Sequence, residues 1–489
     1  MHVMYKRWFI FGLFLLLIIQ LIGCTKHTKA PISNNETPVN LIYYTIGEPD
    51  NDLRKVNDKI NEVLLRKIGI TITYNKIGWQ EYDSRLNTII SSDTPFDIAF
   101  APDYSTYAKQ GKWLKLNDYL MNQGKDMYNA IDPIFWKGVR LPDGSIYGIP
   151  TNKELAVVEH WMYPADLVKK YHIDITKYNT LESLEPLLRM IQINEPDYLP
   201  MEFNRDAHNF FKMYGYEYIT NYKIPLMIQS TQSNASIVNI FETDEAKQIL
   251  KTVRRYYQLG FINKDAALRE PSSLQRGLKV FWKSASGGPL SESVWSKDLG
   301  YQVVAHPVTQ EVATTESVLG GMMTVNANTK HPEESIKFLN LLNTDPELRN
   351  LFNYGIEGVH YNLNKVGQVV LVSPNYTGIQ YTQGNWFILK TLGGKYPDPL
   401  DKWEQYRAYN AKVVESKVLG FNPDLSSLSE QVDEIEIVWN KYYPILMTGS
   451  VDVDTFLPKF NQELHEAGID DVRKAIQAQL NTWQKHHSK

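Results

Sequence analysis

The fold is decided by residues 40–103, which comprise NLIYYTIG (40–47), DLRKVNDKINEVLLRKIG (52–69), ITITYNKI (70–77), WQEYDSRLNTIISS (79–92) and FDIAFAPD (96–103). The first, third and fifth segments are short and apolar and predict strands. The other two predict amphipathic helices, because Val56 and Ile60 in one and Leu86 and Ile90 in the other recur at helical spacing. Strands separated by such helices pair in parallel through right-handed crossovers, so we expect an α/β sheet covered on both faces.

The rest of the chain is long enough for a second lobe, because 489 residues are more than one hydrophobic core usually serves. A Pro-Asp-Gly turn and a short strand in 141–150 suggest that the chain crosses between lobes there. Further strands and helices are expected downstream: strands in 154–163, 277–286 and 300–309, and helices in 180–192, 245–262, 426–449, 455–468 and 469–483. Asn328 or Thr329 is expected to cap a helix that runs to Leu342, and Asp345-Pro346 to start the next.

Composition describes an ordinary globular protein without an electrostatic footprint for nucleic acid. The formal net charge is −4, with 51 basic and 55 acidic residues that are well mixed along the chain. Aromatic residues make up 12% of the sequence. Most of them should fill the cores, but aromatic rings also offer flat faces to ligands.

The N-terminus has the layout of an export signal. Lys6 and Arg7 precede an apolar run that is shorter than the roughly 20 residues needed to cross a bilayer, and LIGC ends at Cys24, the only cysteine. LIGC resembles the lipobox of bacterial lipoproteins, which implies acylation of Cys24; the alternative is an uncleaved anchor with an idle thiol. A single cysteine allows no intramolecular disulfide and excludes Cys-based metal sites. The polar segment 25–38 predicts a flexible tether.

Searches for catalytic patterns find little. The sequence contains no P-loop, no G-x-G-x-x-G, no H-E-x-x-H and no nucleophile elbow. We therefore expect no catalytic residues, no cofactor and no metal site. A pair of carboxylates for glycoside hydrolysis needs a spacing that sequence does not reveal, so an extracellular polysaccharide-active enzyme, a glycoside hydrolase or lyase, remains the alternative function.

Several blocks of the chain are similar, in order, to extracellular solute-binding proteins of bacterial ABC importers, in the carbohydrate-binding group that includes the maltose-binding proteins. These blocks are FDIAFAPDYSTYAKQGKWLKLNDYL (96–120), DGSIYGIP (143–150), GGMMTVNANTKHPEESIKFLNLLNTDPELRNLFNYGIEGVHY (320–361), GNWF (384–387) and AGIDDVRKAIQAQLNTW (467–483). The later blocks resemble a subgroup of large Gram-positive lipoproteins associated with import of complex sugars or oligosaccharides. This resemblance spans residues 24–485.

The resemblance implies a type II binding-protein fold, with two α/β lobes joined by hinge strands and a helical C-terminal portion. It implies a signal peptide (1–23), a lipidated tether (24–38), lobe 1 (39–145), lobe 2 (146–315), a return to lobe 1 (316–360), and then hinge and lobe 2 (361–485). The chain should cross again near 312–321 and 355–361. Function would be that of a monomeric, non-enzymatic receptor, held by lipid on Cys24 at the extracellular face of the membrane. It would deliver a sugar or oligosaccharide to the transmembrane subunits of an ABC permease.

Candidate ligand residues combine flat aromatics with carboxylates and amides, because sugars present apolar C–H faces ringed by hydroxyl groups. Thr45 and Glu48 follow the first strand, at the carboxyl edge where ligands of α/β sheets bind. Asp103 and Tyr104 follow the third strand, where similar proteins place an acidic sugar ligand. The remaining candidates lie downstream: Trp161, Glu202, Asn204, Trp282, Ser284, Trp386 and Asn422. For Glu357, a ligand role and a structural role in a turn stay open.

Overall fold

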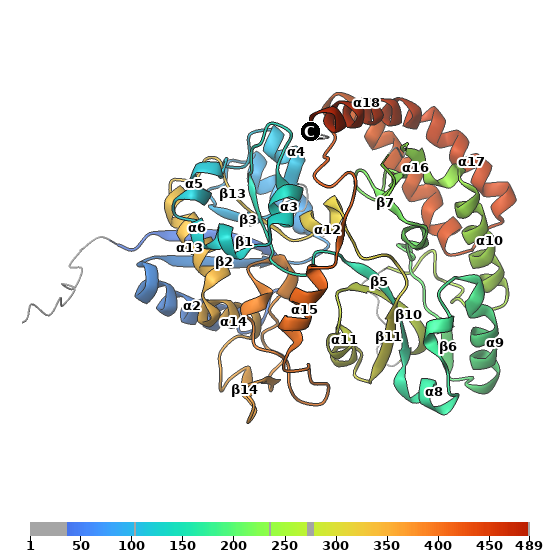
Figure 1. Cartoon of the computed structure of the whole chain (residues 1–489), viewed down its shortest axis with the longest axis horizontal. Helices are drawn as coiled ribbons and strands as arrows, with labels where there is room; N and C mark the ends of the chain where they lie inside the picture. The colour runs from blue at the N-terminus through green and yellow to red at the C-terminus, as the bar shows by residue number, and fades with distance from the viewer. Residues whose placement is uncertain (1–36, 102–103, 234–235, 271–277, 488–489) are drawn as a thin grey trace, which may run out of the picture. The chain divides into compact units, whose positions relative to one another are not determined.

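The first lobe is built on a five-stranded sheet with the order β2-β1-β3-β13-β4. The computed structural model describes residues 37–101, 104–233, 236–270 and 278–487, and Val39–Lys489 forms one unit (Figure 1). The strands of this sheet are β1 (Asn40–Ile46), β2 (Thr71–Ile77), β3 (Ile98–Phe100), β4 (Gly148–Pro150) and β13 (Met322–Val325). The predicted β-α-β-α-β unit is confirmed, because β1 pairs in parallel with β2 and with β3. The late strand β13 enters antiparallel to β3 and β4.

Helices pack around this five-stranded sheet. They are α2 (Leu53–Ile68), α3 (Tyr82–Ser91), α4 (Tyr104–Lys109), α5 (Asn117–Met121), α6 (Lys125–Ala130), α7 (Pro133–Val139), α12 (Thr315–Leu319), α13 (Pro332–Thr344) and α14 (Pro346–Tyr354). Asp345 caps α14 as predicted, since its Oδ1 accepts from Leu348 N at 2.9 Å. The predicted cap of α13 is wrong: the helix begins at Pro332, and Thr329 Oγ1 accepts from His331 N, ahead of the first turn.

The second lobe contains a four-stranded sheet with the order β11-β5-β10-β6, and a three-stranded sheet β7-β8-β9. These strands are β5 (Val158–Pro164), β6 (Tyr198–Met201), β7 (Tyr216–Tyr218), β8 (Leu226–Gln229), β9 (Val238–Asn239), β10 (Lys279–Gly287) and β11 (Val303–Pro307). Its helices are α8 (Ala165–Lys170), η1 (Ile175–Lys177), η2 (Glu182–Leu184), α9 (Glu185–Asn194), η3 (Phe210–Tyr214), η4 (Ile240–Glu242), α10 (Asp244–Gln258), α11 (Glu292–Leu299), η7 (Ser426–Leu428), α16 (Ser429–Met447), α17 (Val453–Glu466) and α18 (Ile469–His487). The helices α10, α16, α17 and α18 pack against one another (Figure 1).

Besides the cores of the two lobes, the structure has a third apolar core. Its residues come from the end of α14 and from the segment that precedes the C-terminal helices in the sequence. Its main members are Tyr354, Tyr361, Val369, Trp386, Leu389, Leu392, Trp403 and Tyr406. The elements here are β14 (Tyr361–Leu363), β15 (Val369–Leu371), η5 (Gln380–Thr382), η6 (Trp386–Ile388) and α15 (Lys402–Asn410). Residues 355–361, expected to cross between lobes, lead from α14 into this third core.

The chain passes between the two lobes in extended segments. Residues 151–157 join β4 to β5, and the return from β11 to β13 contains β12 (Val312–Ala313). A third segment contains β16 (Val414–Glu415), which pairs in parallel with β12 and leads to α16. Among the described helices, none combines the length and the apolar character that crossing a membrane requires.

Candidate functional site

A pocket of about 490 Å³ lies where the crossing segments meet both lobes and the third core. Its walls come from four places: the first crossing segment, lobe 2, α12 with its flanks, and the third core. The lining residues are Lys153, Glu154, Val157, Lys212, Ser286, Gly287, Gly288, Ser291, Val294, Trp295, Thr314, Glu316, Ser317, Gly320, Gln380, Tyr381, Trp386, Lys402 and Tyr406. Segments far apart in the sequence therefore share one concave surface, which is the usual arrangement of a small-molecule site.

Tyr381 of the pocket lining belongs to a pair of exposed aromatic rings. Trp79, which follows β2, stacks on Tyr381 of η5 with ring centroids 5.8 Å apart and planes inclined by 26°. Trp79 is 46% exposed and Tyr381 is 37% exposed, so flat ring surface remains open to a ligand. Glu48 lies beside the pair, because its Oε1 is 3.4 Å from Trp79 N.

The first crossing segment carries two adjacent charges in the pocket wall. Lys153 and Glu154 are each 4% exposed, and Lys153 Nζ is 3.5 Å from Glu154 Oε1. The other oxygen, Oε2, is buried and has no hydrogen-bond partner among the described residues. Asn410 fixes the segment by donating from Nδ2 to Lys153 O at 2.9 Å and accepting at Oδ1 from Leu155 N at 3.0 Å. A buried carboxylate oxygen without a partner is costly, so a donor from a ligand would stabilise it.

Other charges in the pocket are paired. Lys212 Nζ lies 2.9 Å from Glu316 Oε1, and Lys402 Nζ lies 2.9 Å from Asp398 Oδ1. Within the described ranges, no cluster of three or more His, Cys, Asp or Glu side chains is arranged to hold a metal ion. The described lining residues therefore offer aromatic faces, a buried acceptor without a hydrogen-bond partner, and lysines that lie beside carboxylates.

Of the described candidates in lobe 1, Glu48 is linked to this site through its contact with Trp79 N. Thr45 is fully buried in β1, and Tyr104 is buried in lobe 1 with its hydroxyl donating to Val139 O at 2.7 Å. The same hydroxyl accepts from Tyr147 N at 3.1 Å. Asp103 lies outside the described residues.

The two tryptophan candidates of lobe 2 belong to an internal aromatic cluster. Trp161 is 1% exposed, Trp282 is fully buried, and their rings contact edge to face at 5.6 Å. His208 packs on Trp282 at 5.1 Å, and burial lowers the pKa of this imidazole to about 4. Ser284 Oγ donates to Glu159 Oε2 at 3.1 Å. The two tryptophans therefore pack in the core of lobe 2, and Ser284 is engaged in a hydrogen bond.

The other candidates have local partners. Glu202 pairs with Arg269 at 2.9 Å and with Lys283 at 2.7 Å. Asn204 Oδ1 accepts from Asp206 N at 2.9 Å, which makes a turn, and Asn422 Nδ2 donates to Gly420 O at 3.3 Å. Glu357 pairs with Tyr361 in an isolated bridge.

Trp386 is the candidate from the sequence that lines the pocket, where it is 8% exposed. The sequence analysis missed Trp79, Glu154, Lys212 and Tyr381. Trp79 had a signal, because it directly follows the second parallel strand and the strand-end rule applies there too. The other three come from a crossing segment and two short 3₁₀ helices, whose approach to one another no local pattern encodes.

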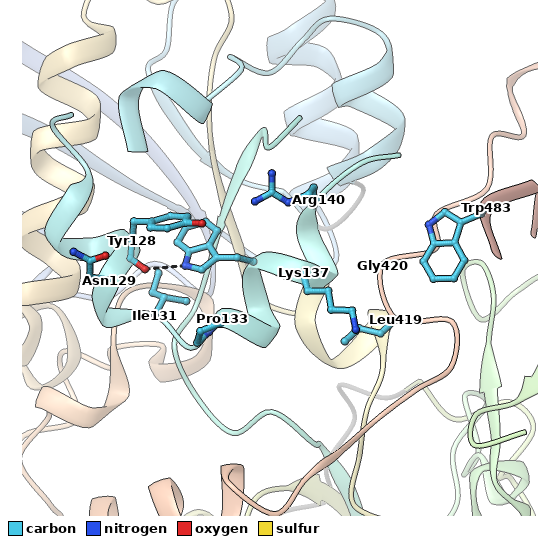
Figure 2. Close-up of a pocket in the computed structure, with 10 residues that line it drawn as sticks. Tyr128, Asn129, Ile131, Pro133, Lys137, Arg140, Leu419, Gly420 and Trp483 are labelled. Carbon is cyan, nitrogen blue, oxygen red and sulfur yellow. Dashed lines mark hydrogen bonds between the residues drawn. The ribbon is translucent and has the colours of Figure 1, made fainter. Parts of the chain in front are cut away.

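A second pocket, of about 400 Å³, lies between α6–α7 and the segment that leads to the C-terminal helices. Figure 2 shows Trp483 on the opposite wall from Tyr128. Three of its polar side chains are already engaged: Trp136 Nε1 donates to Tyr128 O at 3.0 Å, Arg140 Nη1 donates to Gly144 O at 3.0 Å, and Lys137 pairs with Glu415. The first pocket, with open ring faces and an unpartnered acceptor, is the better candidate.

Comparison with known proteins finds relatives that match nearly the whole chain. A protein of Streptococcus pneumoniae serotype 4 (strain ATCC BAA-334 / TIGR4), named carbohydrate ABC transporter substrate-binding protein, is 27% identical over 471 residues. These residues are 95% of this chain and 93% of that protein. The crystal structure of the N-glycan transport solute binding protein (NgtS) from Streptococcus pneumoniae is similar at a TM-score of 0.83 and 26% identity. That match covers 92% of this chain and 99% of the other.

The same relative was solved in complex with Man5GlcNAc, and this structure matches at a TM-score of 0.78 and 26% identity, over 92% of this chain and 99% of the other. These neighbours have the type II solute-binding fold, so the predicted fold class is confirmed. Residues 417–485 match a domain of unknown function, DUF3502. Residues 61–347, more than half of the chain, match the family described as bacterial extracellular solute-binding protein. The chain belongs to the family of bacterial extracellular solute-binding proteins.

Proposed function

We propose that this protein is an extracellular receptor that binds a sugar or oligosaccharide and delivers it to an ABC-type permease. The observation that carries the proposal is the exposed Trp79–Tyr381 stack at the pocket. Pyranose rings present apolar C–H faces that pack on aromatic rings, while their hydroxyl groups need fixed acceptors such as Glu154 Oε2. The pocket supplies both kinds of contact.

The proposed ligand class is a neutral oligosaccharide. Lys153, Lys212 and Lys402 each lie beside a carboxylate, so the described lining residues carry no surplus cation for an acidic sugar. The relative NgtS was crystallised with Man5GlcNAc and with Man1GlcNAc, both neutral glycans. Man5GlcNAc is therefore the first probe to use.

Delivery to a permease is proposed from the relatives and from the N-terminal sequence. A curated relative is named as the substrate-binding protein of a carbohydrate ABC transporter. Lipid on Cys24 would hold a monomeric receptor near the transmembrane subunits, and Cys24 lies outside the described residues. The family is extracellular, which agrees with the proposed location at the outer face of the membrane.

The proposed mechanism is closure of the two lobes around the ligand. Two lobes joined by several chain crossings move about a hinge, and a ligand that contacts both lobes favours the closed form. Small-angle scattering with saturating Man5GlcNAc should show a smaller radius of gyration than the free protein. An unchanged radius at saturation would exclude closure.

Isothermal titration of the protein without its first 24 residues against Man5GlcNAc tests the function. The same titration with an acidic oligosaccharide, such as oligoalginate, tests the ligand class. Binding of the neutral glycan alone is expected, and chromatography after overnight incubation should show that the glycan is unchanged. Cleavage that a single carboxylate substitution abolishes would establish the enzyme instead.

Asp103, a candidate from the sequence analysis, remains a proposed ligand. Asp103 follows β3 in the sequence and lies outside the described residues. Asp103→Ala should weaken glycan binding by roughly 1.5–3 kcal/mol if it makes a charge-assisted hydrogen bond. An unchanged affinity would remove Asp103 from the site.

A further inference from the structure

A single backbone oxygen beside the pocket is held by two side chains. Arg349 Nη2 of α14 donates to Gln380 O at 2.8 Å, and Trp386 Nε1 donates to the same oxygen at 2.8 Å. Tyr381, the next residue, stacks on Trp79. We propose that Arg349 is a positioning residue for the sugar site, which holds Tyr381 in its stack without touching the ligand. This inference rests on the proposed function.

The connection from Arg349 to the Tyr381 ring is short and stiff. Gln380 O and Tyr381 N belong to one planar peptide unit, so a donor that holds the oxygen also holds the plane that contains the N and Cα of Tyr381. The next carbonyl is confined as well: a Cβ at Gly321 would lie 2.3 Å from Tyr381 O. Tyr381 is thus set by its backbone, while its ring remains 37% exposed.

Arg349 is a buried cation, which is a costly way to make a purely structural hydrogen bond. Its side chain is fully buried, and it has no carboxylate partner among the described residues. Arg349 Nε has no hydrogen-bond partner among the described residues. Arg349 Nη1 donates to Asn353 Oδ1 over a long distance of 3.4 Å. Burial lowers the pKa of Arg349 to about 10. A buried cation without a carboxylate partner costs stability.

The backbone around Arg349 is shaped to admit it. Gly384 has φ +72°, and a Cβ there would lie 2.7 Å from Arg349 Cδ and 2.8 Å from Nε. The segment 380–386 is joined to the first crossing segment by Asn152 N, which donates to Gly384 O at 3.0 Å, and by Trp386 N, which donates to Asn152 O at 2.9 Å. The long side chain therefore reaches past a glycine to the one carbonyl that precedes Tyr381.

A double-mutant cycle tests the proposal with Man5GlcNAc as the probe. Arg349→Met should weaken binding by roughly five- to tenfold in the wild-type background, because the charged donor to Gln380 O is lost. In the Tyr381→Ala background it should have no further effect, since Arg349 acts through Tyr381. Equal losses in both backgrounds would overturn the proposal and assign Arg349 a general structural role.

A readout without ligand separates this inference from the proposed function. In protein labelled with 5-fluorotryptophan, the ¹⁹F resonance of Trp79 is assigned through Trp79→Phe. Arg349→Met should move that resonance toward its position in Tyr381→Ala, while the resonance of Trp113, buried in lobe 1, stays in place. An unmoved Trp79 resonance would refute the positioning role. If the glycan does not bind wild-type protein, the proposed function fails while the resonance still decides the role of Arg349.

If Arg349→Met does not fold, Arg349→Lys replaces it in both experiments. Lysine keeps a buried cation but lacks the planar fork of guanidinium N–H donors that reaches Gln380 O. The proposal expects Arg349→Lys to shift the Trp79 resonance and to weaken glycan binding. If this variant leaves both unchanged, Arg349 does not position Tyr381.

Discussion

Lys212 Nζ lies 2.9 Å from Glu316 Oε1, and this ion pair joins η3 of lobe 2 to α12, which packs in the core of lobe 1. The pair lies in the wall of the candidate site. When two lobes move about a hinge, the contacts between them either break or persist. The Lys212–Glu316 ion pair is therefore expected to favour the closed form, in which the ligand contacts both lobes.

Breaking this ion pair should weaken glycan binding modestly. Both side chains are partly exposed, 26% for Lys212 and 51% for Glu316, so Lys212→Met is expected to cost about 0.2–1 kcal/mol of binding free energy. Titration calorimetry at low and high salt measures the loss, which should shrink as salt screens the wild-type pair. Lys441→Met, which removes an ion pair within lobe 2, is the matched control and should leave affinity unchanged. An equal loss in both variants would contradict a role specific to the pocket.

Removal of either ring of the stacked pair should reduce affinity for Man5GlcNAc. Trp79→Ala and Tyr381→Ala each delete one exposed face, and a loss of roughly 1–2 kcal/mol is expected by titration calorimetry. Tyr222→Ala serves as control, because Tyr222 is 50% exposed and packs on Trp439 in lobe 2. Full affinity in both pocket variants would place the ligand elsewhere.

Neutralising Glu154 should weaken glycan binding. Its Oε2 is a buried acceptor without a described partner, and Glu154→Gln turns one carboxylate oxygen into an amide donor. We expect a loss of roughly 1.5–3 kcal/mol if a ligand hydroxyl donates to this oxygen. The control is Glu404→Gln on α15, whose side chain is 70% exposed. Tight binding by the Glu154 variant would show that the ligand does not use this carboxylate.

Glu217 should make the protein less stable as pH rises. Burial raises the pKa of this carboxyl from 4.5 to about 8, with Ser416 Oγ donating to Oε1. The folded state therefore holds a proton that the unfolded chain releases, so the free energy of unfolding falls from about pH 4.5 to about pH 8. Urea unfolding between pH 5 and pH 9 should show this decline in the wild type and a flatter curve in Glu217→Gln. Identical pH profiles would mean that Glu217 is ionised in the folded protein.

Lipid attachment at Cys24 is tested on the native membrane fraction. Mass spectrometry is expected to find an N-terminus at Cys24 with acyl chains on the residue, because LIGC follows a short apolar run with Lys6 and Arg7 ahead of it. Cys24→Ser should release the protein into the medium or leave it uncleaved. An N-terminus at Met1 with a free thiol in the wild type would contradict the prediction.

The sequence by itself determined the first parallel strands and the helices between them. Val56 and Ile60 of α2 recur at helical spacing and are buried, and β1 is paired in parallel with β2 and β3. These features are local: a period of 3.6 residues needs only its own segment to be recognised, and the crossover rule then fixes the pairing.

Only the tertiary structure decided which side chains meet in the pocket. Trp161 and Trp282 had the right chemistry for a sugar but are buried within lobe 2, while Tyr381, in an unpatterned segment, stacks on Trp79. The physical reason is that a pocket is formed by the approach of distant segments, and that approach depends on the packing of whole lobes. Residue type restricted the chemistry of the site; long-range packing selected its members.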